Sequence, residues 1–214
     1  MTVFFDKTLK DLNRRLDLLD SNFERLILLN RPFRISERNS FQEGLMSALW
    51  QSWCHFCKEI VLGSIVDGVT TKGISVTSTY STYNERELVY IASRFIKGAS
   101  ISTIKEAPRY TDLTWGDASK LNSVITSFNP TNHATLLSGL SGVILLRDLQ
   151  KFRNANAHIS SFTIGELKGA RTKYSNTKFM HPSDTMFWVD PSTKDYLWKS
   201  WVEEIKIVST LMSE

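Results

Sequence analysis

The chain contains few cysteines. It has two in 214 residues, Cys54 and Cys57. A chain of this length buries enough apolar surface to fold without disulfide bonds or a structural metal. Because two cysteines without an export signal are typical of a reduced compartment, the sequence predicts a cytoplasmic protein.

Long hydrophobic runs are also missing. No stretch of about 18 apolar residues occurs, so we expect no transmembrane helix and no membrane partner. The most apolar stretch, residues 136–146, is shorter and is interrupted by serine and glycine. The first ten residues, MTVFFDKTLK, are charged almost from the start and contain no apolar signal-peptide core.

The metal-binding and phosphate-binding patterns of common cofactor sites are missing as well. Cys54 and Cys57 look like half of a zinc site, but no second ligand pair follows, and structural zinc takes four ligands. Both cysteines lie in an apolar helical pattern, where cysteine packs as a small apolar residue. Neither glycine-rich phosphate loop, G-x-x-x-x-G-K-[ST] or G-x-G-x-x-G, occurs. We therefore expect no metal and no cofactor.

Charge is mildly positive overall and concentrated in one segment. The chain has 26 Lys and Arg against 22 Asp and Glu, which gives a formal net charge of +4. Residues 147–178 alone carry seven basic residues against two acidic ones, so the surplus of this stretch exceeds that of the whole chain. Such a segment is compatible with nucleic-acid binding. The basic residues are Arg147, Lys151, Arg153, Lys168, Arg171, Lys173 and Lys178.

Apolar residues recur at helical spacing along most of the chain, with little of the alternation that strands show. The pattern predicts an all-α fold, a helical bundle of about five to seven helices with long loop insertions, in a single domain covering residues 1–214. The expected helices cover about 5–29, 40–65, 85–97, 117–128, 133–152 and 190–211, with a shorter one starting at Thr163. The loop at 66–83 includes a short extended piece at 74–76.

Local signals set the expected helix ends. Arg31-Pro32 ends the first helix, and Asn129-Pro130 ends the fourth. The capping-box pattern Ser40-Phe41-Gln42-Glu43 begins the second, and Asp190-Pro191-Ser192 begins the last.

The segment 149–158, LQKFRNANAH, has the clearest chemical potential, near the end of the helix predicted over 133–152. Arg153 offers a permanent positive charge to a phosphate, and His158 can give or take a proton near neutral pH. Positions four apart share one face of a helix, so Asn154 and His158 align if the helix continues through the motif. The spacing then lets these three side chains converge on one phosphate.

This set of side chains suits RNA because RNA carries its own nucleophile, the 2′-hydroxyl. Histidine can serve as the acid or base, and arginine can stabilise the charge that develops on the phosphate. The expected products are a 2′,3′-cyclic phosphate and a 5′-hydroxyl.

The same residues also have a structural interpretation. Basic side chains are common at helix C-termini, where Lys151 and Arg153 would complement the carbonyl dipoles and His158 would cap the helix. Likewise, the basic residues after the motif either form a solvated face or contact RNA, and in the second case binding would depend strongly on salt.

The motif resembles the hallmark of the HEPN superfamily, which is an arginine followed by a polar residue and then, after four to six residues, a histidine. Arg153-Asn154-Ala155-Asn156-Ala157-His158 matches the version with four intervening residues, with Asn154 as the polar residue. The preceding Leu-Leu-Arg-Asp-Leu-Gln-Lys-Phe is similar to the amphipathic helix that leads into the motif in this family. The all-α prediction and the long helix at 40–65 agree with the resemblance.

The resemblance implies a metal-independent endoribonuclease of the standalone prokaryotic kind, a toxin or abortive-infection effector in antiviral defence. It implies catalytic roles for Arg153, Asn154 and His158, and a homodimer in which two motifs form one composite site. An antitoxin or regulatory partner would restrain the enzyme. We predict RNA contacts from the nearby cations Lys151, Lys168, Arg171 and Lys173.

Two other functions remain open. The first is a catalytically inactive HEPN-like module that binds RNA or a protein partner. The second is an enzyme that acts on nucleotides rather than on RNA, although the chain lacks the glycine-rich loops of common nucleotide sites.

Overall fold

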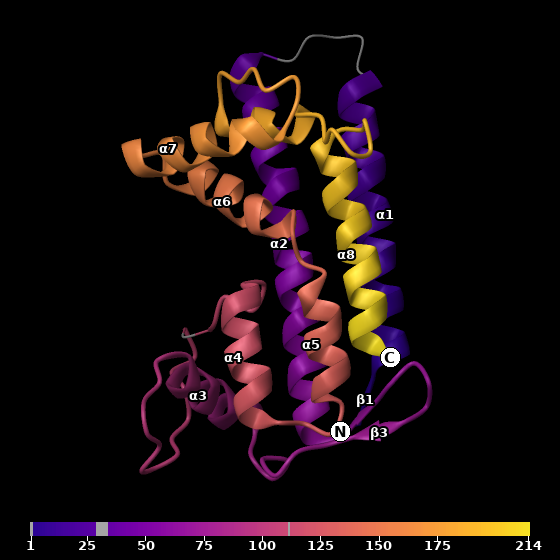
Figure 1. The fold of residues 1–214 in the computed structure, drawn as a ribbon, viewed down its shortest axis with the longest axis vertical. Helices are drawn as coiled ribbons and strands as arrows, with labels where there is room; N and C mark the ends of the chain where they lie inside the picture. Colours follow the sequence, from indigo (N-terminus) through magenta and orange to yellow (C-terminus); the bar gives the residue numbers. More distant parts are fainter. Residues whose placement is uncertain (1, 29–33, 111) are drawn as a thin grey trace. The chain divides into compact units, whose positions relative to one another are not determined.

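A computed structural model describes residues 2–28, 34–110 and 112–214 (Figure 1). Helices account for 66% of the chain, which confirms the predicted all-α class. Within the described residues the number of α-helices is eight, more than the predicted five to seven. They are α1 (Phe5–Leu28), α2 (Ile35–Val66), α3 (Glu85–Ile96), α4 (Ala118–Phe128), α5 (His133–Ser141), α6 (Leu146–Ala157), α7 (Ser161–Ala170) and α8 (Leu197–Ser213).

The chain divides into two compact units. The first consists of Met1–Leu12, Cys54–Gly142 and Val208–Glu214, and the second of Asn13–Trp53 and Val143–Ile207. The helices α1, α2 and α8 therefore supply residues to both units. The single domain over 1–214 stays a prediction.

The first unit contains a small sheet and the helices α3, α4 and α5. Strand β1 (Val3–Phe4) pairs parallel with β2 (Gly68–Val69), which pairs antiparallel with β3 (Ser75–Val76). The extended piece expected at 74–76 is thus confirmed for β3. Gly68 permits a close approach, since a Cβ there would lie 2.7 Å from the ring of the fully buried Phe5.

Helices α3 and α4 begin and end close to where the sequence predicts. Asn84 forms a capping box with Glu87 at the start of α3, and Asp117 accepts hydrogen bonds from the first N–H groups of α4. Asn129 ends α4 in the left-handed conformation, with φ of 45°. These helices pack on one another, and α4 also packs on α5.

The second unit has an aromatic core. Phe23 stacks on Phe187 and on Trp198, with ring centroids 5.5 and 5.1 Å apart. Phe152 of α6 meets Trp188 and Trp201 at 5.3 and 6.0 Å. The short 3-10 helix η2 (Pro182–Phe187) follows α7 and the 3-10 turn η1 (Arg171–Lys173), and η2 packs against α6.

The single long helix predicted over 133–152 is wrong. Helix α5 ends at Ser141, α6 begins at Leu146, and four residues separate them. The N–H groups of Ile144, Leu145 and Leu146 donate to the carboxylate of Glu204 in α8, at 2.6 to 3.4 Å. This carboxylate replaces the carbonyl acceptors that a continuous helix would supply, and so it stabilises a new helix start.

Three other predicted helix starts are displaced. Helix α2 begins at Ile35 rather than Ser40, because Glu37 already accepts the N–H of Arg34. Helix α7 begins at Ser161, two residues before the predicted start at Thr163, and Ser160 caps it together with Thr163.

Helix α8 begins at Leu197 rather than at 190, because the Asp190 carboxylate accepts both the N–H and the hydroxyl of Ser192 and closes a turn instead. The predicted stop at Arg31-Pro32 lies outside the described residues. In the described part of the chain, none of the helices is both long enough and apolar enough to cross a membrane.

Candidate functional site

Helix α6 carries most of the predicted motif in its last turn. Leu149, Phe152 and Ala155 are fully buried and fix one face of the helix in the core. Residues three or four apart share a face, so this burial leaves Arg153 and Asn154 half-buried at the edge of that core. Helix α6 packs against α7 and η2, and α7 is drawn beside it in Figure 1.

Arg153 and Asn154 contact one another directly. Nη1 of Arg153 donates to Oδ1 of Asn154 at 3.4 Å. The Nε of Arg153 is buried and finds no acceptor among the described residues. A guanidinium has five N–H donors, so Arg153 keeps unused donor capacity, which suits an anionic ligand.

Asn156 connects the motif to the core. Its side-chain nitrogen lies 2.9 Å from the sulfur of the buried Met46 in α2. This contact fixes the last turn of α6 on the neighbouring helix.

His158 lies outside the helix. Helix α6 ends at Ala157, and His158 is its C-cap residue with φ of −141° and ψ of 80°. The expected alignment of Asn154 and His158 on one helical face depends on helical backbone through His158, and this condition is not met. The backbone N–H of His158 still donates to the carbonyl of Asn154 at 2.9 Å, so His158 ends the helix through its backbone.

The turn that carries His158 is short and hydrogen-bonded. The hydroxyl of Thr163 donates to the carbonyl of His158 at 2.8 Å, and Thr163 also forms the capping box with Ser160 that starts α7. The His158 side chain is exposed to solvent. These bonds fix the backbone of His158 between the packed helices α6 and α7, and its side chain is accessible.

Two of the four predicted RNA-contact cations are already paired. Asp148 is only 2% exposed, and its carboxylate lies 2.9 Å from Nζ of Lys173 and 3.7 Å from Nζ of Lys151. The hydroxyl of Tyr174 donates to the same carboxylate at 2.7 Å. Burial and the neighbouring Asp148 raise the pKa of Tyr174, which keeps the phenol protonated as a donor.

The other two predicted cations have no acidic partner among the described residues. Lys168 is exposed on α7. Arg171, just after α7, donates through Nε to the hydroxyl of Thr177 at 3.3 Å, and its guanidinium carbon lies 5.9 Å from the ring centre of Phe179. Because Asp148 partly neutralises Lys151 and Lys173, Lys168 and Arg171 carry more of the available positive charge.

Sequence reasoning missed Glu204 and Asp148 as residues that shape the site. Glu204 lies in α8, about 60 residues from the N–H groups that it binds, and no local pattern connects them. Burial raises the pKa of Glu204, although the three N–H groups and Arg147 lower it in part. The core prediction for the cysteines agrees with full burial of Cys57, where burial and the nearby Cys54 raise the pKa of the thiol.

Replacing Glu204 with alanine should destabilise the protein by about 1–3 kcal/mol, because the N–H groups at the start of α6 lose a charged acceptor. For a chain of this size, each kcal/mol lowers Tm by about 2–4 °C, which thermal unfolding followed by circular dichroism measures. The adjacent Glu203 is exposed, so Glu203→Ala serves as the matched control and should leave Tm nearly unchanged. Equal Tm values for the two variants would contradict the role of Glu204.

No protein-family model matches the chain, and no curated protein or solved structure shows significant similarity to it. The HEPN resemblance therefore rests on the six motif residues and the helical pattern of the chain.

Proposed function

We propose that the chain is a metal-independent endoribonuclease in which Arg153, Asn154 and His158 act on one phosphate. The observation that carries this proposal is their placement in the last turn and cap of one helix. Arg153 and Asn154 are in contact there, and His158 is accessible directly after them. In this proposal the Arg153 guanidinium supplies positive charge, the Asn154 amide supplies orientation, and the His158 imidazole transfers a proton.

The chemistry proceeds by attack of the substrate's own 2′-hydroxyl. The 2′-oxygen bonds to the adjacent phosphorus as the bond to the 5′-oxygen breaks, which yields a 2′,3′-cyclic phosphate and a 5′-hydroxyl. His158 takes the proton from the 2′-hydroxyl or gives one to the departing 5′-oxygen. The Arg153 guanidinium stabilises the charge on the phosphate oxygens in the transition state.

The proposed active form is a homodimer. Ile159 follows His158 directly, Phe162 lies four residues after His158, and these two side chains are 63% and 72% exposed. Exposed apolar side chains grouped beside a site are typical of an interaction surface. A second copy here would bring the partner's His158 to the same phosphate, so that one imidazole serves as the base and the other as the acid.

In the cell we propose a cytoplasmic toxin or abortive-infection effector, restrained by an antitoxin or another regulatory partner. This part of the proposal comes from the HEPN resemblance. The basic surplus of residues 147–178 supports RNA as the substrate.

The alternative is a catalytically inactive module that binds RNA or a protein partner. One observation favours it: the His158 ring makes no hydrogen bond with any described residue. An acid or base in a hydrolytic site is usually oriented by a third group. In the alternative, the motif would bind phosphate without moving a proton.

The proposal is tested on the products and on the nucleophile. RNA fragments made in EDTA should carry 2′,3′-cyclic phosphates and 5′-hydroxyls, as read by end labelling with and without phosphatase. Once a cut site is mapped, an oligonucleotide with a single 2′-deoxy nucleotide at that site should resist cleavage there. Fragments with 5′-phosphates, or equal cleavage of the 2′-deoxy substrate, would contradict the proposal. RNA binding without any cleavage would favour the alternative.

A further inference from the structure

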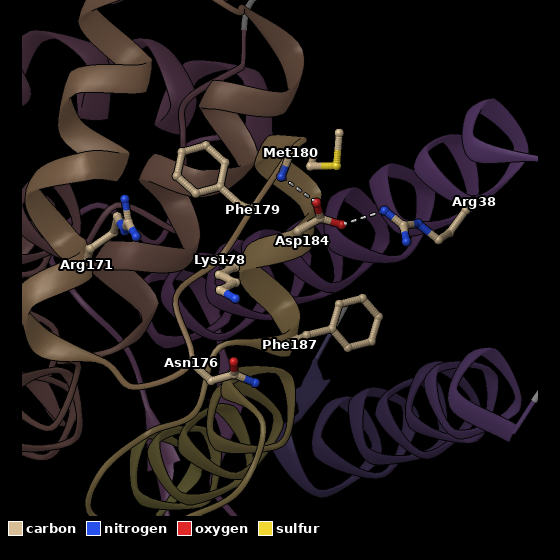
Figure 2. A pocket seen from close by; sticks show the side chains of 8 residues that line it. All are labelled: Arg38, Arg171, Asn176, Lys178, Phe179, Met180, Asp184 and Phe187. Atoms are coloured by element: carbon tan, nitrogen blue, oxygen red, sulfur yellow. Dashed lines mark hydrogen bonds and ion pairs between the residues drawn. The ribbon is translucent and has the colours of Figure 1, made fainter.

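A second site lies in the same unit, on side chains outside the motif. It is a pocket of about 640 Å³ formed by the start of α2, the segment after α7 and η2 (Figure 2). This volume is within the range of about 300–1,000 Å³ that is typical of small-molecule sites. No sequence pattern indicated it, because its walls come from residues 38 and 171–187.

The pocket has an excess of positive charge. Its cations are Arg38, Arg171 and Lys178, and the only acid among the described residues that line it is Asp184. Asp184 binds Arg38 at 3.1 Å and also accepts the backbone N–H groups of Met180 and His181. Neither Arg171 nor Lys178 has an acidic partner in the described part of the chain. In Figure 2, Lys178 is seen between Arg171 and the Arg38–Asp184 pair.

The pocket is also lined by aromatic rings. Phe179 and Phe187 line the pocket and are half-buried, so part of each ring stays accessible. Phe187 stacks on Phe23, and Phe179 contacts Trp188 at a centroid distance of 6.0 Å and the Arg171 guanidinium at 5.9 Å. These contacts restrict the movement of the rings, and the accessible part of such a ring can stack on a nucleobase.

We propose that this pocket binds a nucleotide, with its phosphate at Arg171 and Lys178 and its base against the accessible part of the Phe179 ring, which lies beside Arg171. Two cations without an acidic partner in the described part of the chain select an anion, and the Phe179 ring beside Arg171 selects an anion that carries a planar group. A free phosphate would leave the rings unused, and an uncharged base would leave both cations unused. A nucleotide uses both features.

The bound nucleotide can be a free nucleotide or one nucleotide of an RNA strand. The pocket wall η2 packs on α6, the helix that carries Arg153 and Asn154. A strand held in the pocket would thus bind to the same packed group of elements as the motif. The RNA source rests on the proposed function, whereas nucleotide binding itself does not depend on cleavage.

Calorimetric titration of the full chain tests the proposal with four probes: 5′-AMP, adenosine, inorganic phosphate and a 2′-O-methyl tetraadenylate that resists 2′-hydroxyl attack. We expect 5′-AMP to bind more tightly than adenosine and phosphate. The double variant Arg171→Ala/Lys178→Ala should weaken 5′-AMP binding by about 100-fold, roughly tenfold for each charged contact. Phe179→Leu should weaken it at least about fivefold through lost stacking.

The matched control is Lys7→Ala/Arg15→Ala, which removes two exposed cations of α1 and should leave the affinity for 5′-AMP unchanged. Tighter binding of the tetraadenylate than of 5′-AMP supports RNA as the source, and the reverse order supports a free nucleotide. The proposal is overturned if 5′-AMP binds no better than phosphate or adenosine. It is also overturned if a folded Arg171→Ala/Lys178→Ala variant binds 5′-AMP like the wild type.

If the ribonuclease proposal fails, the results differ from those that overturn the nucleotide pocket. A chain that does not cut RNA but binds 5′-AMP through Arg171 and Lys178 would retain the nucleotide pocket without the activity. Conversely, Arg153→Ala should leave 5′-AMP binding intact, because Arg153 does not line the pocket.

Discussion

Replacing His158 with alanine is expected to slow RNA cleavage by about 10²- to 10⁴-fold, the range for loss of a general acid or base. The side chain is exposed at the end of α6, and its cap contacts are made by the backbone. The variant should therefore keep the wild-type free energy of unfolding while losing the reaction. Single-turnover cleavage in EDTA, with protein in excess over RNA, measures the rate of the chemical step.

Two controls accompany this variant. His55 is exposed on α2, and His55→Ala should cut RNA at the wild-type rate. Added imidazole should restore part of the activity of His158→Ala, because it supplies the missing proton carrier. Cleavage by His158→Ala at the wild-type rate would show that the imidazole takes no part in the reaction.

Replacing Arg153 with alanine should lower the cleavage rate by about 10²- to 10³-fold, as removal of one oxyanion-stabilising donor does. Arg153→Lys should also remain impaired, because a lysine lacks the planar fork that places two donors on one phosphate. The affinity for RNA should fall far less than the rate, since only one positive charge is lost or moved. Single-turnover rates across a range of protein concentrations separate the two quantities.

The comparison for Arg153 is Arg15→Ala, which removes an exposed arginine from α1. It should change neither rate nor affinity. If Arg153→Ala weakened RNA binding but left the rate at saturation unchanged, the guanidinium would hold RNA without stabilising the transition state. That result would contradict its assigned catalytic role.

The helix ends that depend on short-range sequence signals were predictable. Asn84 and Glu87 lie three residues apart at the start of α3, and Asn129 precedes a proline at the end of α4. Such caps act within a single turn, so their residue types can be identified without tertiary structure. The helix starts at 35, 161 and 197 were misplaced by the sequence. At each of them, two alternative local hydrogen-bonding patterns compete, and the residue types in the two patterns are similar.

The break between α5 and α6 has a local part and a distant part. Gly142 caps α5 locally, whereas the Glu204 carboxylate, which accepts the N–H groups at the start of α6, comes from α8 and could not be identified from residues 133–152. Similarly, Lys173 and Asp148 are 25 residues apart, and nothing local shows that Asp148 is buried between two lysines and a tyrosine.

The candidate site was predicted in part. The sequence placed the motif near the end of a predicted helix, and the structure has Arg153 and Asn154 in the last turn of α6. Alignment of Asn154 with His158 was expected only if the helix continued through the motif, and α6 ends at Ala157. The pocket with Arg38 and Lys178 combines residues about 140 positions apart, so charge patterning along the chain indicated a basic segment and not a pocket.

The most direct test of the ribonuclease proposal is incubation of total RNA and tRNA with the purified wild-type chain in EDTA. The wild type should produce discrete fragments, while Arg153→Ala and His158→Ala prepared in parallel should not. Intact RNA with the wild type, or the same fragments with all three proteins, would contradict catalysis by Arg153 and His158.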